Sequence, residues 1–160
     1  MNDTVLERPS DTSASDASCS VVTLTVAGQL CGVPVLGVRD VLADQTITRI
    51  PLAPPEIAGS LNLRGRIVTA IDLRRRLRLP PGEKGSARMS VVTEQGGELY
   101  ALVVDQVSEV LSLPASRLER NPPTLPAAWA ACSNGIVRLA DRLLVLLDIG
   151  RLLDIPAIRG

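Results

Sequence analysis

The sequence contains two copies of one pattern, and this internal repeat restricts the fold more than any other feature. Residues 59–77 match residues 135–153 when one segment is shifted by 76 positions (148 − 72 = 76). The matched pairs are Gly59 and Gly135, Leu63 and Leu139, Arg66 and Arg142, Asp72 and Asp148, Arg75 and Arg151, and Leu77 and Leu153. Upstream, residues 20–23 recur as 90–93, and residues 38–42 recur as 107–111. Chance similarity in a chain rich in valine and leucine is the alternative. The matches keep their order and include glycine, aspartate and arginine, which favours a duplication.

Each copy consists of short strand-like runs separated by turn residues. Residues 22–26 alternate at the strand period, residues 66–71 and 143–147 are apolar runs, and residues 89–93 and 99–104 flank Gly96 and Gly97 as a hairpin. Short helical turns are expected at residues 56–60, 73–79 and 126–132, and after Asp148. The sequence therefore predicts a mainly β fold with short helices, in which duplication produces two small barrels or strongly bent sheets packed together.

The domain organisation follows from changes in composition. Residues 1–18 are rich in Ser, Asp and Thr and predict a disordered tail. One ordered domain is expected over residues 19–156, with the first repeat at about 20–79 and the second at about 88–154. A connector rich in Pro, Gly and charged residues separates the two repeats.

Composition excludes several classes of function. The chain has no histidine, so it lacks the commonest general base and metal ligand. Lys plus Arg equals Asp plus Glu at 17 each, and aromatic residues make up 1%, which disfavours nucleic-acid binding. Three widely spaced cysteines match no zinc or redox motif, and no run has the length of a membrane span. These features predict a cytoplasmic protein without cofactor, metal site or catalytic residues.

Residues 54–74 resemble the signature of CheW-type chemotaxis coupling proteins. The matching features are Pro54, Ile57 and Gly59, then Asn62, Leu63, Arg64 and Gly65, then a strand that ends in Ile71, Asp72, Leu73 and Arg74. Residues 103–111 resemble the second-half motif of the same family, and the likeness extends from about residue 21 to residue 153. The chain has Leu24 and Cys31 where the family often has aromatic residues, and Asp40 where it usually has glutamate.

The resemblance implies two SH3-like β-barrel subdomains and a non-catalytic scaffold. Such proteins bridge the cytoplasmic tips of chemoreceptors, the methyl-accepting chemotaxis proteins, to the regulatory domain of the histidine kinase CheA. The expected partners are therefore a CheA-type kinase and a receptor tip, at membrane receptor arrays but without membrane insertion. A scaffold for a related surface-motility or other chemosensory kinase pathway is the alternative. A nucleic-acid-binding β-barrel and a small enzyme or nucleotide-binding domain are poorly supported.

The resemblance and the repeat together indicate which residues contact the receptor and the kinase. The candidates are Val38, Asp40, Val41, Gly59, Asn62, Arg64, Gly65, Val103, Asp105 and Val107. Arg64 offers a planar fork of donors suited to partner carboxylates or carbonyls, although an internal ion pair is the alternative. Arg64 falls opposite Ala140 in the repeat, and Gly65 falls opposite Asp141. Positions that differ between copies are better candidates for function than shared ones.

Two further groups of charged residues have competing interpretations. Asp72 and Asp148 each precede a helical turn, which predicts N-capping rather than a catalytic carboxylate pair. Residues 74–78 contain four arginines. A solvated helix face is the preferred interpretation, electrostatic steering of an acidic partner is the second, and nucleic-acid binding is the least favoured.

Overall fold

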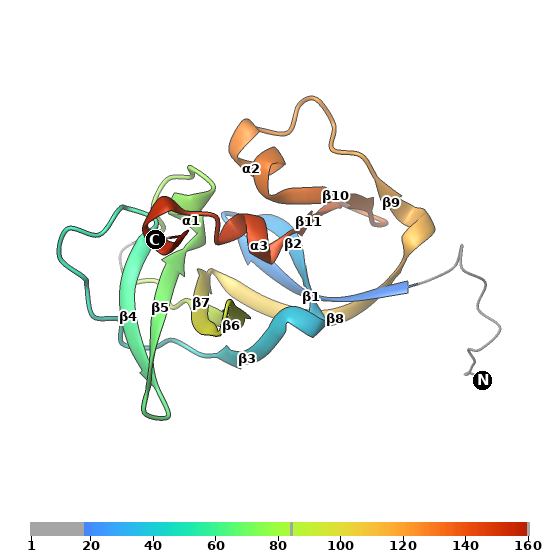
Figure 1. The fold of residues 1–160 in the computed structure, drawn as a ribbon. Coiled ribbons are helices and arrows are strands. Elements are labelled where there is room, and N and C mark those ends of the chain that lie inside the picture. Colours follow the sequence, from blue (N-terminus) through green and yellow to red (C-terminus); the bar gives the residue numbers. More distant parts are fainter. Residues whose placement is uncertain (1–17, 84, 160) are drawn as a thin grey trace.

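A computed structural model describes residues 18–83 and 85–159, and over these ranges the chain forms two β-sheets with short helices (Figure 1). The strands are β1 (Ser18–Val26), β2 (Gln29–Pro34), β3 (Val38–Leu42), β4 (Ile57–Leu63), β5 (Arg66–Asp72), β6 (Met89–Gln95), β7 (Glu98–Val104), β8 (Gln106–Pro114), β9 (Leu118–Glu119), β10 (Ser133–Arg138) and β11 (Leu143–Leu147). The helices are α1 (Leu73–Arg76), α2 (Ala127–Cys132), α3 (Ile149–Leu152), α4 (Pro156–Arg159) and the 3-10 turns η2 (Val35–Gly37) and η3 (Ala115–Arg117). The predicted tail lies outside the described residues except for Ser18, which begins β1.

The first five strands of the six-stranded sheet correspond in order to the five strands of the other sheet, but neither sheet is built from one repeat. One has the order β8-β1-β2-β11-β10-β9, and the other has the order β3-β6-β7-β5-β4. Hairpin β1–β2 of the first repeat lies between β8 and β11 of the second, while hairpin β6–β7 of the second lies between β3 and β5 of the first. Each repeat therefore contributes one hairpin to the sheet whose other strands come from the other repeat. The predicted mainly β fold with two subdomains related by duplication is confirmed, with this exchange as an added finding.

The core lies mainly between the two sheets. Along β7 the side chains alternate, as the strand period requires: Tyr100, Leu102 and Val104 join a large cluster fed by both sheets, while Ala101 and Val103 join a smaller cluster inside the five-stranded sheet. A third cluster fills the six-stranded sheet. Because β7 is buried on both faces, its sequence is a continuous apolar run. The largest cluster joins the subdomains, so they form one body.

Some local predictions were wrong. The expected helical turn at residues 56–60 is instead the start of β4, which pairs with β5 from Ile57 opposite Ile71 onward. Pairing with an apolar neighbouring strand outweighs the weak helix-start signal of Pro55. Helix α1 ends at Arg76, three residues before the predicted end. The local pattern also missed β10, and the alignment of residues 59–63 with 135–139 did not supply it, because its counterpart β4 was itself not predicted as a strand.

Candidate functional site

The β4–β5 hairpin carries Arg64 at its tip. Arg64 and Gly65 have φ angles of 51° and 85°, and two successive positive values define a type I′ turn. The amide of Gly65 donates to Oδ1 of Asn62 at 2.9 Å, which closes the turn. Asn, Asp and Gly are the usual residues at this position, and an ordinary residue there costs about 1–2 kcal/mol. Arginine is thus retained at a strained position, with its side chain 80% exposed.

Arg64 reaches across to strand β3. Its Nη2 lies 3.3 Å from Oδ2 of Asp40, whose Oδ1 also accepts from the amide of Val41. The internal ion pair that sequence analysis left as the alternative is therefore present. An exposed ion pair of this kind contributes only about 0–1 kcal/mol, so either member can exchange its partner at little cost. The remaining donors of the Arg64 guanidinium are exposed to solvent.

Strand β3 lies at the edge of its sheet, and its valines differ in exposure. Val38 is half-buried against the large core cluster, whereas the side chain of Val41 is 39% exposed. The counterpart of β3 in the repeat is β8, also an edge strand, and Val110 on β8 is 61% exposed. Leu36, in the turn that leads into β3, is 91% exposed. Val110 and Leu36 are not among the predicted contact residues, although the repeat match of Val41 with Val110 was a usable signal for Val110.

The two edge strands approach one another through β6. Leu42 of β3 pairs with Ser90 of β6, and the neighbouring Met89 accepts through Sδ from the amide of Val107 on β8 at 3.3 Å. Val107 itself is half-buried against the large cluster. Figure 1 shows β3 and β8 along the lower side of the molecule. Both exposed valines therefore belong to strands that flank the junction between the sheets.

Gly59 serves the fold. It lies at a bulge in β4 with φ of 148°, and a Cβ there would collide with the carbonyl of Thr48. Thr48 and Ser60 exchange two backbone hydrogen bonds of 2.8 Å, which fixes that carbonyl in place. Close backbone approach therefore explains the glycine without any partner protein.

The predicted contact residues of the second-half motif, residues 103–107, also have partners within the fold. Val103 is 2% exposed and packs in the core of the five-stranded sheet, so its side chain does not face solvent. Asp105 accepts two hydrogen bonds from Arg74 and one from the amide of Ala27. Partial burial raises the pKa of Asp105, but the hydrogen bonds from Arg74 and Ala27 outweigh burial and lower the pKa below its ordinary value. This carboxylate is ionised, and it already accepts hydrogen bonds from donors within the protein.

The other charged groups have structural partners. Asp72 accepts from the amides of Arg74 and Arg75, and Asp148 accepts from that of Arg151, so the predicted N-caps are confirmed. Arg76 of the basic cluster donates to the carbonyls of Leu152 and Arg151. Two of the four arginines in the cluster are therefore engaged within the molecule, and Arg75 and Arg78 remain exposed.

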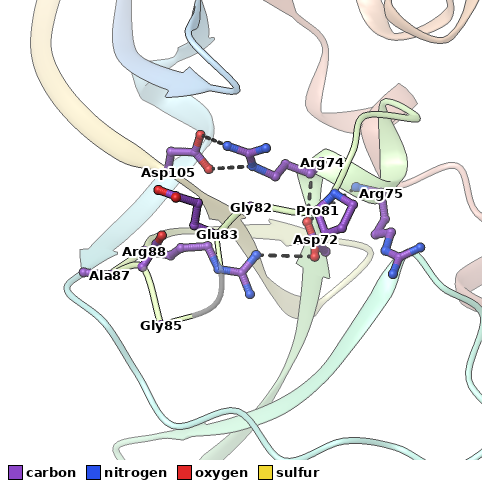
Figure 2. A pocket seen from close by; sticks show the side chains of 11 residues that line it. Asp72, Arg74, Arg75, Pro81, Gly82, Glu83, Gly85, Ala87, Arg88 and Asp105 are labelled. Carbon is purple, nitrogen blue, oxygen red and sulfur yellow. Dashed lines mark hydrogen bonds and ion pairs between the residues drawn. The ribbon is translucent and has the colours of Figure 1, made fainter.

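Within residues 18–83 and 85–159, no group of three or more His, Cys, Asp or Glu side chains could hold a metal ion. An open hollow of about 490 Å³ lies beside α1, and its walls carry the Asp72–Arg88 and Arg74–Asp105 ion pairs (Figure 2). None of the helices in the described part is long and apolar enough to cross a membrane.

Comparisons with known proteins give a consistent result. A family model described as the CheW-like domain matches residues 20–157. The chain is 33% identical over 130 residues to the chemotaxis protein CheW of Klebsiella aerogenes, covering 81% of this chain and 78% of that protein. It is 30% identical over 135 residues to CheW of Bacillus subtilis, covering 84% and 86%. The crystal structure of the scaffolding protein TtCheW from Thermoanaerobacter tengcongensis matches with a TM-score of 0.77 and 29% identity, covering 88% of this chain and 95% of that one.

Proposed function

Because this chain belongs to the CheW-like domain family, we propose that it is a non-catalytic adaptor that couples chemoreceptors to a CheA-type histidine kinase. The family match and the similarity to a scaffolding protein support the adaptor class. Within this proposal the protein works in the cytoplasm at receptor arrays. A related chemosensory kinase pathway, such as surface motility, would use the same kind of adaptor.

The observation that carries the proposal is the exposed Arg64 held in a strained turn beside Asp40. Arg64 keeps a left-handed backbone conformation while its side chain makes no core contact, which supports a role for that side chain outside the core. We define the docking surface as Asp40, Val41 and Arg64 together with Leu36 and Val110. It combines exposed apolar side chains with an ion pair that can open at little cost. Such a surface suits the receptor tip.

The mechanism is thermodynamic linkage. The adaptor binds the receptor at the docking surface and the regulatory domain of the kinase at another face. If binding of the receptor changes the free energy of kinase binding, then binding of the kinase changes the free energy of receptor binding by the same amount. Chain composition fits reversible contacts, because few aromatic anchors are present.

The test is a calorimetric titration of the full chain with a receptor-tip fragment and, separately, with the kinase regulatory domain. We expect Arg64→Ala to weaken receptor binding by about tenfold or more. The matched control is Arg138→Ala, because Arg138 on β10 forms an exposed ion pair with Glu119 on β9, the edge of the six-stranded sheet opposite β8. Failure of folded wild-type protein to bind either partner would overturn the proposal. A polyanion titration at several salt concentrations tests the nucleic-acid alternative, which predicts strong, salt-sensitive binding.

A further inference from the structure

Asp105 lies where the chain passes from one sheet to the other. It follows β7 of the five-stranded sheet and precedes β8 of the six-stranded sheet. Its carboxylate accepts from Nε of Arg74 at 3.0 Å and from Nη2 of Arg74 at 2.7 Å (Figure 2). It also accepts from the amide of Ala27 at 2.8 Å. Arg74 belongs to α1, which extends from the five-stranded sheet, whereas Ala27 lies in the β1–β2 turn of the other sheet. One carboxylate therefore joins three segments across the junction.

Arg74 is held both by its backbone amide and by its guanidinium. Its backbone amide donates to Asp72, the N-cap of α1, and Asp72 also forms an ion pair with Arg88. Its Nη1 donates to the carbonyl of Pro80 at 3.0 Å. Arg74 and Asp105 are only 18% and 26% exposed, in contrast to the exposed Arg64. A forked, largely buried bridge holds one geometry, whereas an exposed ion pair samples several.

The backbone of Asp105 also contacts the six-stranded sheet, next to the start of β8. The amide of Asp105 donates to the carbonyl of Thr25, so the first residue before β8 is tied to β1. Val110 of the docking surface lies five positions farther along the same strand (110 − 105 = 5). Asp105 therefore ties the start of edge strand β8 to β1, to the β1–β2 turn and, through Arg74, to α1 of the five-stranded sheet.

The repeat indicates that this bridge is not part of the shared scaffold. The counterpart of Arg74 is Gly150 (74 + 76 = 150), and the counterpart of Asp105 is Leu36 (105 − 69 = 36). Arg74 belongs to the first repeat and Asp105 to the second, so the equivalent pair, Gly150 and Leu36, also spans both repeats. The equivalent junction therefore folds without such a bridge, which argues against a purely architectural need for it.

We propose that Asp105, acting through Arg74, is a positioning residue that fixes the relation between edge strands β3 and β8, and so sets the affinity of the docking surface for its partner. The affinity part rests on the proposed function, while the positioning part does not. In this proposal Asp105 does not itself contact the partner, because its carboxylate already accepts hydrogen bonds within the molecule.

The test measures the distance between the two edge strands in the full chain. Spin labels are attached in an Arg39→Cys, Ser112→Cys, Cys19→Ser background, since Cys31 and Cys132 are buried. Pulsed dipolar spectroscopy then compares this parent with Asp105→Asn and Arg74→Lys. Arg138→Gln is the control, because its ion pair with Glu119 lies within one sheet. Titration with a receptor-tip fragment follows on each unlabelled variant.

We expect Asp105→Asn to broaden the distance distribution and to weaken fragment binding by about tenfold, the effect of losing one charge-assisted hydrogen bond. Arg74→Lys keeps the positive charge but loses the two-pronged contact of the guanidinium with Asp105. It should therefore give a smaller change in both measurements. It replaces Asp105→Asn as the test variant if Asp105→Asn does not fold. Unchanged distances in a folded variant would overturn the inference. Broadened distances with wild-type affinity would overturn the link to docking. If wild-type protein binds no fragment, the proposed function fails, and the distance measurement still decides the positioning role.

Discussion

Gly59 and Gly135 occupy equivalent bulges in the two sheets, and each faces a backbone carbonyl where a side chain would lie. Their φ angles are 148° and 139°, and the facing carbonyls belong to Thr48 and Glu119. The register shifts at the same place in both strands, β4 and β10. The duplication has therefore preserved a close backbone approach that only glycine permits.

Gly59→Ala should destabilise the protein strongly. The new methyl group meets a carbonyl that is fixed by two hydrogen bonds, and the backbone is strained as well, so we expect a loss of about 2–4 kcal/mol in the free energy of unfolding. Gly65→Ala is the matched control, since a Cβ at Gly65 meets nothing and only the positive φ remains, at about 1 kcal/mol. Urea denaturation measures both. Equal losses for the two variants would show that the Thr48 carbonyl yields to the methyl group.

Arg64→Asn should separate stability from binding. Asparagine tolerates the left-handed conformation better than arginine, so we expect the free energy of unfolding to rise by about 0.5–1 kcal/mol. Loss of the guanidinium should at the same time weaken receptor binding. Denaturation and calorimetry provide the two readouts. A stability loss above about 1 kcal/mol would mean that the ion pair with Asp40 outweighs the strain of the turn.

Asp105 should contribute to the acid sensitivity of the fold. Its pKa is lower in the folded protein than in the unfolded chain, so its stabilising effect is fully present above the unfolded pKa of about 3.9. That effect is lost as the pH falls through the folded pKa. The difference in unfolding free energy between wild type and Asp105→Asn should therefore be constant above about pH 5 and shrink below pH 4. Urea titrations from pH 3 to pH 7 measure this difference, and a pH-independent difference would contradict the assignment.

Arg76 should stabilise the junction of the two repeats. Its guanidinium donates to the carbonyls of Leu152 at 2.9 Å and Arg151 at 2.8 Å, at the end of α3. We expect Arg76→Met to reduce the free energy of unfolding by about 1–2 kcal/mol, because two acceptors lose a charged donor. The exposed neighbour provides the control, and Arg75→Met should change stability by less than about 0.5 kcal/mol. Similar effects for both variants would show that the two hydrogen bonds contribute nothing net.

The sequence alone determined the features that depend on neighbouring residues or on internal similarity. The strand period predicted the hairpin β6–β7, and the side chains of Asp72 and Asp148 predicted both N-caps, because these interactions span only a few positions. The repeat predicted two related subdomains. It also carried the signal for Val110, which matches Val41. It carried none for β10, because its counterpart β4 was itself not predicted as a strand.

Only the tertiary structure decided which strands pair and which charges meet. Exchange of the hairpins β1–β2 and β6–β7 depends on packing between segments far apart in the chain, and an apolar strand pattern does not specify its neighbour. For the same reason the motif that contains Asp105 did not indicate that Arg74 and Ala27 meet at its carboxylate. Arg64 met Asp40 because the barrel brings a hairpin tip to an edge strand. The local pattern specifies the elements, whereas the packing of the whole chain assigns their partners.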